Sequence, residues 1–218
     1  IHNVGAPGIE NIVKIDLLDK KIFEKKLKFN FLNKNLIITF HPVTLDYKKS
    51  KKQFKSLLKS LNKLSDTLLI FTKSNSDPEG SLINKMIDSY VSKNSRNSVA
   101  FFSLGSSNYL SILNIVDGVV GNSSSGIIEA PSLKKGAINI GDRQLGRVFT
   151  NNVINCSYDS EQIDYALKKL YSKKFQIQLK KITNPYGRGN VSDKILKVVI
   201  NTDLKKIIKK KFYDIKKN

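Results

Sequence analysis

The sequence contains few of the residues that form disulfides and metal centres. Its 218 residues include one cysteine, Cys156, and two histidines, His2 and His41. A single cysteine excludes an internal disulfide framework, and so few Cys and His residues argue against a zinc site. We therefore expect neither a metal nor a cofactor.

Long apolar stretches and export signals are also missing. No run approaches the roughly 20 apolar residues that cross a bilayer, and no charged-then-apolar leader opens the chain. We therefore expect a cytoplasmic protein without a membrane partner. Hydrophobic residues still make up 40% and aromatic residues 9% of the chain, which suffices for the core of one large domain.

Acidic residues are scarce relative to basic ones. There are 38 Lys and Arg against 18 Asp and Glu, a net charge of +20, which raises the question of nucleic acid. The lysines are spread along most of the chain, and no RNP-like motif, zinc finger or paired recognition helix accompanies them. We interpret them as solvated faces and expect no nucleic-acid partner, although a basic surface would steer an anionic small substrate.

Apolar runs and helical patterns alternate along the chain. Short apolar runs that end in polar or glycine residues predict buried strands at 36–41, 67–72, 98–102, 117–121 and 137–140, with 153–156 as a further candidate. Helical spacing of apolar residues predicts helices within 54–64, 83–91 and 109–116. This alternation predicts an α/β fold, a Rossmann-like parallel sheet with helices on both faces.

The two ends of the chain differ from this middle part. Asn3–Ile12 is a turn-rich stretch, and a lysine-rich segment without clear strands follows it. Near the other end, apolar residues at helical spacing predict one or two helices and then a basic tail. We therefore divide the chain into residues 1–35, a core domain at 36–190 and a C-terminal helical segment at 191–218.

Polar clusters follow four of the predicted strands, at 41–44, 74–80, 122–126 and 141–147. The carboxyl ends of parallel strands share one edge of a sheet, where open α/β sheets bind their ligands. Taken alone, His41 is also explained as a satisfied structural histidine, and 74–80 as an ordinary turn sequence. Their convergence on one edge predicts a ligand site.

The turn Asn122–Gly126 suits a phosphate group. A helix that starts near Ser124 or Ser125 presents free N–H groups and the positive end of its dipole. Serine hydroxyls add donors, and Gly126 would allow close approach of the backbone. Ordinary N-capping by serine is the competing explanation, and we favour the phosphate site.

Glu129 and two arginines are further candidates. Glu129 is expected one turn into the helix, four residues after Ser125, whereas a capping box requires three. Its carboxylate could accept both hydroxyls of a ribose. Arg143 and Arg147 offer donors for phosphate or base, although either alone is also explained as a surface residue.

Several catalytic signatures are absent. The chain contains no Walker A motif, no G-x-G-x-x-G after a strand, no H-E-x-x-H and no G-x-S-x-G. These absences weaken the kinase, dehydrogenase, zinc-protease and α/β-hydrolase interpretations.

Five motifs in order resemble one known family. They are FHPVT (40–44), SNSD (74–77), GNSSSGIIEAP (121–131), INIGDRQLGR (138–147) and YGRGN (186–190). Together they resemble the carboxyl-terminal domain of the hydrolysing UDP-N-acetylglucosamine 2-epimerases, which feed the synthesis of sialic, legionaminic and related acids. NVGAPGIENI (3–12) resembles the segment that leaves that family's first domain.

The resemblance implies a fold and a set of site residues. The family has two Rossmann-like domains around a cleft, the GT-B arrangement, and this chain would be the second half. Serines would contact the diphosphate of UDP and Glu129 its ribose. The positions that match the family's UDP site are His41, Asn75, Ser123, Ser124, Glu129 and Arg143. One departure is Ser103-Leu104-Gly105, where relatives have a histidine and a proline.

The implied reaction removes the C2 proton, eliminates UDP to give a glycal and adds water to release a free ManNAc-type sugar. The family's catalytic acids lie in the first domain, so this chain is expected to bind UDP without turning over alone. Relatives commonly form homo-oligomers. A GT-B glycosyltransferase, a basic nucleic-acid-binding domain and a non-catalytic module remain competing hypotheses, and the sugar is left open.

Overall fold

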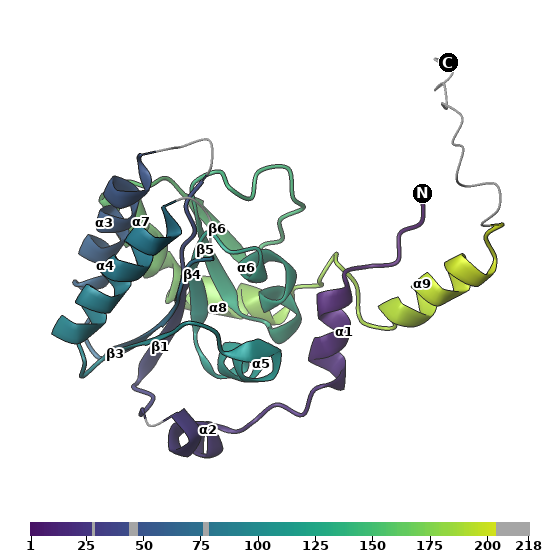
Figure 1. Cartoon of the computed structure of the whole chain (residues 1–218), viewed down its shortest axis with the longest axis horizontal. Helices are drawn as coiled ribbons and strands as arrows, with labels where there is room; N and C mark the ends of the chain where they lie inside the picture. Colours follow the sequence, from purple (N-terminus) through teal and green to yellow (C-terminus); the bar gives the residue numbers. More distant parts are fainter. Residues whose placement is uncertain (28, 44–47, 76–78, 204–218) are drawn as a thin grey trace, which may run out of the picture.

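A single parallel sheet forms the centre of the protein (Figure 1). The structure is a computed structural model and describes residues 1–27, 29–43, 48–75 and 79–203. In this part of the chain the strand order is β3-β2-β1-β4-β5-β6, and every neighbouring pair is parallel. The strands are β1 (Lys34–Thr39), β2 (Thr67–Thr72), β3 (Ser98–Phe101), β4 (Gly118–Gly121), β5 (Gly136–Ile140) and β6 (Val153–Cys156). The predicted α/β class and all six predicted strands are confirmed.

Helices connect and cover the strands. They are α1 (Pro7–Lys14), α2 (Lys20–Leu27), α3 (Ser50–Leu61), α4 (Gly80–Lys93), α5 (Gly105–Ile115), α6 (Ser125–Ile128), the 3₁₀ helix η2 (Ala130–Leu133), α7 (Ser160–Leu170), α8 (Lys173–Lys180) and α9 (Val191–Ile200). The helices α3, α4 and α5 confirm the predicted helices between the first four strands. Within the described ranges, no helix has both the length and the apolar character to cross a membrane.

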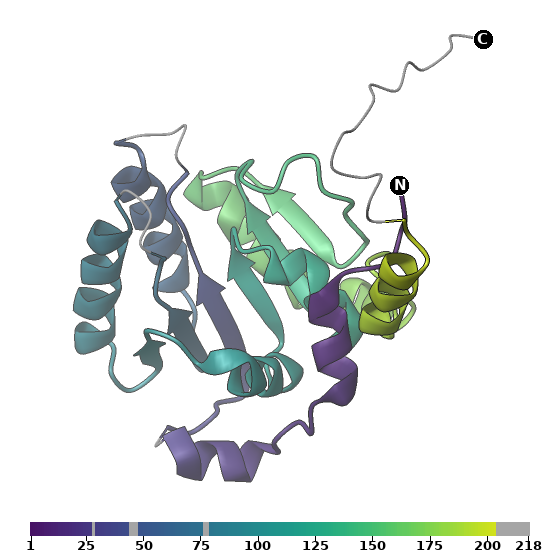
Figure 2. The same cartoon turned by 45° about the vertical axis from the view of Figure 1, so that its right-hand side comes forward.

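The two faces of the sheet carry separate apolar layers, because successive side chains of a strand point to opposite faces. Leu36 and Ile38 of β1 pack with α3, α4, α7 and α8. Ile37, between them, packs on the other face with α5 and η2. Figures 1 and 2 show α3 and α4 on one side of the sheet and α5 on the other. This covering of both faces explains why the strands read as continuous apolar runs.

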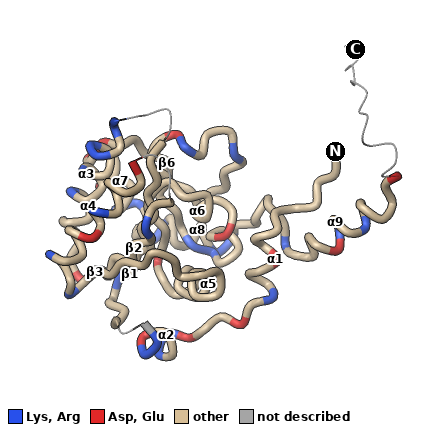
Figure 3. Tube along the Cα trace, in the orientation of Figure 1, with Lys and Arg blue, Asp and Glu red and all other residues tan. Residues whose placement is uncertain are grey.

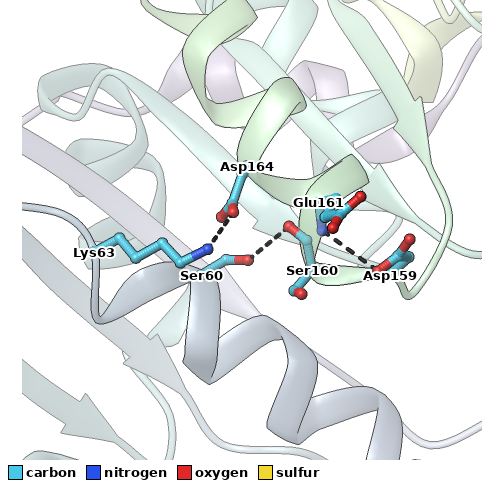
Figure 4. Close-up of polar contacts among 6 residues, drawn as sticks. All are labelled: Ser60, Lys63, Asp159, Ser160, Glu161 and Asp164. Atoms are coloured by element: carbon cyan, nitrogen blue, oxygen red, sulfur yellow. Dashed lines mark hydrogen bonds and ion pairs between the residues drawn. The ribbon is translucent and has the colours of Figure 1, made fainter.

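Polar contacts fix α7 against α3 on one face (Figure 4). The buried Ser60 hydroxyl of α3 donates to the carbonyl of Ser160 over 3.0 Å. Lys63 forms an ion pair with Asp164 of α7. The side chain of Asp159 caps α7 by accepting a backbone N–H from its first turn. These contacts hold the helix that follows β6 beside the helix that follows β1.

The first 33 residues differ from the prediction of a turn-rich stretch and a segment of unspecified structure. The turn-rich stretch forms α1, since Pro7 at the start of the helix has the φ angle that a helix needs. The lysine-rich segment contains α2. Phe23, Phe29 and Phe31 are buried in the layer that also holds α5, so this segment contributes to the core.

The helices α1 and α9 lie side by side at one end of the molecule, as both views show (Figures 1 and 2). The Glu10 carboxylate of α1 accepts the backbone N–H and the hydroxyl of Ser192, both over 2.7 Å. It also pairs with Lys14, and the bonds to Lys14 and Ser192 lower the pKa of Glu10 to about 2. The helix α9 lies within the predicted C-terminal helical segment, and residues 204–218 of that segment lie outside the described residues.

Basic side chains are distributed over many elements rather than gathered on one (Figure 3). Lys and Arg occur on the helices of both faces and in the connecting loops, interspersed with fewer acidic residues. This distribution matches the dispersed pattern of lysines along the sequence.

Candidate functional site

The order of the strands creates a crevice between β1 and β4. The chain leaves β1 toward β2 on one side and leaves β4 toward β5 on the other, so the two strands flank the topological switch point. Ligands of open α/β sheets bind outside the carboxyl ends of the strands at this point. His41 follows β1 and Asn122 follows β4, so two of the predicted polar clusters flank the crevice.

Asn122 ties the ends of these two strands together. Its side chain is fully buried, its Oδ1 accepts the backbone N–H of His41 over 2.7 Å, and its Nδ2 donates to the carbonyl of His41 over 2.8 Å. Its own carbonyl accepts hydrogen bonds from Gln144 over 2.8 Å and Arg143 over 3.2 Å. Asn122 therefore orders the loops after β1, β4 and β5 with bonds made inside the protein.

A cavity of about 350 Å³ opens at this edge. Three of the predicted site residues, His41, Asn75 and Ser123, line it from the ends of β1, β2 and β4. The other lining residues are Thr39, Thr72, Lys73, Phe102, Ser103, Leu104, Gly105, Ser106 and Tyr109. The loop with the departure from the family pattern thus forms one wall. Within the described residues, no three His, Cys, Asp or Glu side chains gather into a metal-binding group.

The imidazole of His41 is buried and its orientation is defined by the loop after β2. The Nδ1 atom lies 3.3 Å from the hydroxyl oxygen of Ser74, and the backbone N–H of Asn75 donates to it over 3.4 Å. A backbone N–H can only donate, so Nδ1 acts as an acceptor, and the proton of a neutral imidazole is on Nε2. The donor of a neutral His41 side chain is therefore Nε2–H.

The serine turn leaves donors unused within the protein. The helix α6 starts at Ser125, as predicted, but the side chain of Ser124 makes no capping hydrogen bond. The hydroxyl of Ser123 instead accepts the N–H of Ser125 over 3.3 Å. In the described part of the chain, the backbone N–H groups of Ser123 and Ser124 donate to no protein acceptor. Because α6 has only four residues, these N–H groups matter more than its dipole.

Gly126 has a packing role in addition to the one predicted. A Cβ atom built on Gly126 would lie 2.9 Å from the Cβ of Ala137 on β5. The missing side chain therefore allows close packing of α6 on the sheet, and the approach of a ligand to the backbone at Gly126 stays a prediction.

Glu129 lies at the junction of α6 and η2 rather than inside a longer helix, which corrects the predicted position. Its Oε2 atom is buried and has no hydrogen-bond partner among the described residues. Burial raises the pKa of Glu129, while a hydrogen bond from Ser125 and the charge of Arg147 act in the opposite direction. A Cβ built on Gly8 of α1 would lie 3.0 Å from its Oε1.

The pattern of the sequence missed the polar role of Tyr109. The residue was assigned to the apolar face of its helix, and it does pack against that layer. Its hydroxyl, however, donates to the Ser125 hydroxyl over 2.6 Å. The only available signal was that a partly buried tyrosine needs a partner for its O–H.

The two arginines occupy the rim of the site. Arg143 and Arg147 are exposed and neither lines the cavity. The guanidinium of Arg143 reaches back to the carbonyl of Asn122, so it lies beside the serine turn. Ser124 lies in the turn, Glu129 follows α6 and Arg143 reaches back to the turn, while the other three predicted residues line the cavity.

These features define the class of protein. A parallel sheet of order β3-β2-β1-β4-β5-β6, with its crevice at the switch between β1 and β4, is a Rossmann-like domain. The sequence model of the UDP-N-acetylglucosamine 2-epimerase family matches residues 1–200. The chain belongs to this family, and the predicted relationship is confirmed.

Individual relatives agree with this assignment. A hydrolysing GDP/UDP-N,N'-diacetylbacillosamine 2-epimerase of Campylobacter jejuni is 42% identical over 99% of this chain and 56% of its own length. The chain thus spans about half the length of the curated relatives it matches. A Methanocaldococcus jannaschii UDP-GlcNAc 2-epimerase, solved with UDP-GlcNAc and UDP, superposes with a TM-score of 0.63 at 18% identity, over 90% of this chain and 54% of the other.

The fold is shared beyond this family. The C-terminal domain of a Francisella tularensis glycosyltransferase superposes with a TM-score of 0.54 at 15% identity, over 86% of this chain and 96% of that domain. The predicted likeness to the second half of a GT-B enzyme is confirmed at the level of the fold.

Proposed function

We propose that this chain is the UDP-binding half of a hydrolysing UDP-sugar 2-epimerase. The observation that carries the proposal is the cavity of about 350 Å³ at the switch point, lined by His41, Asn75 and Ser123. Family membership and the 42% identity to the Campylobacter enzyme support the same function. The name of that relative favours a 2,4-diacetamido-6-deoxy sugar over UDP-GlcNAc, for a nonulosonic acid such as legionaminic acid.

In this proposal each site residue has a distinct role. The free N–H groups and hydroxyls of Ser123 and Ser124 donate to the diphosphate, and Arg143 offsets its charge. Glu129, which directly follows α6, accepts the ribose hydroxyls with its carboxylate. His41 and Asn75 hold the nucleotide from the other side of the crevice.

The proposed reaction has two steps. A general base removes the C2 proton while the bond between C1 and the UDP oxygen breaks, which leaves a C1=C2 double bond. Water then adds, its oxygen to C1, with a proton returned to C2 on the opposite face. The site described here would stabilise the departing diphosphate, and carboxylates from the part of the relatives that this chain does not match would move the protons.

The remaining features of the proposal follow from the family. We propose that residues 1–35 lead from a preceding domain, that 36–190 form the UDP-binding domain and that 191–218 form a C-terminal helical segment. A cytoplasmic location and a homo-oligomer are part of the same proposal. Within it, this chain binds nucleotide but does not turn over alone.

Calorimetric titration with UDP tests the proposal. UDP should bind the unaltered chain at moderate salt, and the affinity for UDP should fall in Glu129→Ala. The affinity should stay unchanged in Glu161→Ala, a matched control that removes an exposed carboxylate of α7. GDP should be titrated in parallel, because the Campylobacter relative is named for both nucleotides. Binding of a short RNA with steep salt dependence, but not of UDP, would contradict the proposal and favour the nucleic-acid interpretation.

A GT-B glycosyltransferase is the second candidate, because the Francisella domain has the same fold. The two are separated by supplying the longer protein with a UDP-sugar and no acceptor. Release of a free reducing sugar with inverted configuration at C2 supports the epimerase. A requirement for an acceptor alcohol, with transfer of the sugar to it, supports the transferase.

A further inference from the structure

Tyr109 reaches from α5 to the start of α6. Its hydroxyl donates to the Ser125 oxygen over 2.6 Å, although the two residues are 16 positions apart in the sequence. Burial raises the pKa of Tyr109, and the bond to Ser125 only partly opposes this. The phenol therefore keeps its proton and remains a donor throughout the neutral pH range.

This bond restricts where the Ser125 hydroxyl can direct its own proton. A serine hydroxyl has one proton to donate and two lone pairs to accept. Tyr109 occupies one lone pair, so the proton of the Ser125 hydroxyl is directed toward another acceptor. Glu129 follows one turn later: its backbone N–H donates to the Ser125 carbonyl over 3.0 Å, and its carboxylate interacts with the Ser125 side chain, which acts to lower the pKa of Glu129 against the effect of burial. Tyrosine, serine and carboxylate thus form one connected group.

The carboxylate is enclosed on the other side by α1. A Cβ at Gly8 would lie 3.0 Å from Glu129 Oε1, so only a glycine leaves that oxygen its present space. The second oxygen, Oε2, is buried and accepts no hydrogen bond from any described residue. The carboxylate is therefore confined by the protein on one side, while its other oxygen has acceptor capacity that no described residue uses.

We propose that Tyr109 is a positioning residue that holds Glu129, through Ser125, in the orientation that recognises the ribose hydroxyls of the nucleotide. This inference rests on the proposed function and deepens it. Tyr109 also lines the cavity of His41 and Ser123, so the connected group links the wall of the cavity to the carboxylate. Selectivity for a ribose with both hydroxyls would follow from this orientation.

The experiment compares the affinity of UDP with that of 2′-deoxy-UDP by calorimetry. The unaltered chain should prefer UDP, because one hydroxyl partner of Glu129 is lost in the deoxy ligand. Tyr109→Phe should lower the affinity for UDP by roughly 3- to 10-fold, which corresponds to the usual net free energy of one hydrogen bond. The affinity for 2′-deoxy-UDP should fall much less. The ratio of the two dissociation constants should therefore collapse toward one.

Two further variants make the test specific. Ser125→Ala breaks the same connected group at its middle and should give the same collapse of the ratio. Tyr165→Phe removes the hydroxyl of an exposed tyrosine on α7 and should leave both affinities unchanged. Ser125→Ala should also move the pH at which selectivity appears upward, because a hydrogen bond that lowers the pKa of Glu129 is lost.

The outcomes separate this inference from the proposed function. If UDP binds the unaltered chain and Tyr109→Phe and Ser125→Ala weaken both ligands equally, the residues are only structural and the inference is overturned while the UDP site stands. Equal affinity of the unaltered chain for UDP and 2′-deoxy-UDP also overturns it. If the unaltered chain binds no UDP, the proposed function and this inference fail together.

Discussion

Replacing Asn122 with alanine would test whether this one amide holds the switch point of the sheet together. The side chain is fully buried and exchanges two hydrogen bonds with the backbone of His41, of 2.7 and 2.8 Å. His41 itself is only 8% exposed, so water cannot readily replace the lost partners. Asn122→Ala therefore removes the hydrogen bonds that its side chain makes to one buried N–H and one buried carbonyl.

The expected cost can be worked from these two groups. Each buried polar group that loses a hydrogen-bond partner costs about 1–3 kcal/mol, so the loss of two such bonds should lower the free energy of unfolding by about 2–6 kcal/mol. Domains are stable by only about 5–15 kcal/mol, so this loss is a large fraction of the total. The UDP affinity should also fall, because Ser123 directly follows Asn122 in the turn.

Urea denaturation followed by circular dichroism would measure the change. The midpoint should move to lower urea with an unchanged slope if only stability is affected. Asn122→Asp keeps the acceptor for the His41 N–H but turns an oxygen toward the His41 carbonyl, so it should recover little of the loss. The control is Asn62→Ala at an exposed helix end, which should stay within about 0.5 kcal/mol.

A shift for Asn122→Ala as small as that of Asn62→Ala would refute the reasoning. It would mean that the two strand ends are held by the sheet ladder alone. A loss of UDP affinity without a loss of stability would instead point to a direct contact of Asn122 with the ligand.

Three further predictions concern other parts of the fold. Gly121→Ala should destabilise the protein by several kcal/mol more than Gly146→Ala in the same denaturation assay. Both glycines have positive φ, but a Cβ at Gly121 would lie 1.8 Å from a β1 carbonyl oxygen, whereas nothing lies within 4 Å of a Cβ at Gly146. Equal losses of stability would contradict the clash. The pKa of Glu10 is lowered to about 2, so the ionised carboxylate should stabilise the start of α9. This stabilisation should be complete at pH values above 4.5, the ordinary pKa of a glutamate, and should be lost as the pH falls through about 2. Hydrogen exchange at the Ser192 amide should then accelerate, relative to its intrinsic rate, across this acidic window and be insensitive to pH in Glu10→Gln. Lys63→Ala should cost at most about 1 kcal/mol, since its ion pair is exposed to solvent; a larger loss would show that this contact contributes more to docking α7 than its exposure suggests.

The strands and the edge that holds the site could be predicted from local sequence. The run from Leu36 to His41 is apolar and ends in polar residues because β1 is buried on both faces. The same argument located the other strands. Once the strands are parallel, their carboxyl ends must share one edge, so the convergence of His41, Asn75 and Ser123 followed from topology rather than from any single motif.

Where the local pattern was ambiguous, the prediction was wrong or incomplete. The stretch around Pro7 contains glycines and a proline, which are typical of turns, yet it forms α1 because a proline at the first position favours a helix. For Gly126 the prediction was incomplete: glycine permits the approach of a ligand, but the structure adds that Ala137 of the neighbouring strand leaves no room for a side chain there. The sequence shows that a glycine is present at position 126, whereas the packing of neighbouring elements shows what that glycine does.

The sequence by itself determined the alternation of strands and helices, the family and the edge of the sheet where a ligand would lie. Only the tertiary structure decided what the individual polar groups do. His41 and Asn122 are 81 residues apart, and Tyr109 approaches Ser125 from another helix, so these bonds exist only after the sheet has formed. Periodicity records which face of an element is buried, whereas the partner of a buried polar group depends on which other element packs against that face.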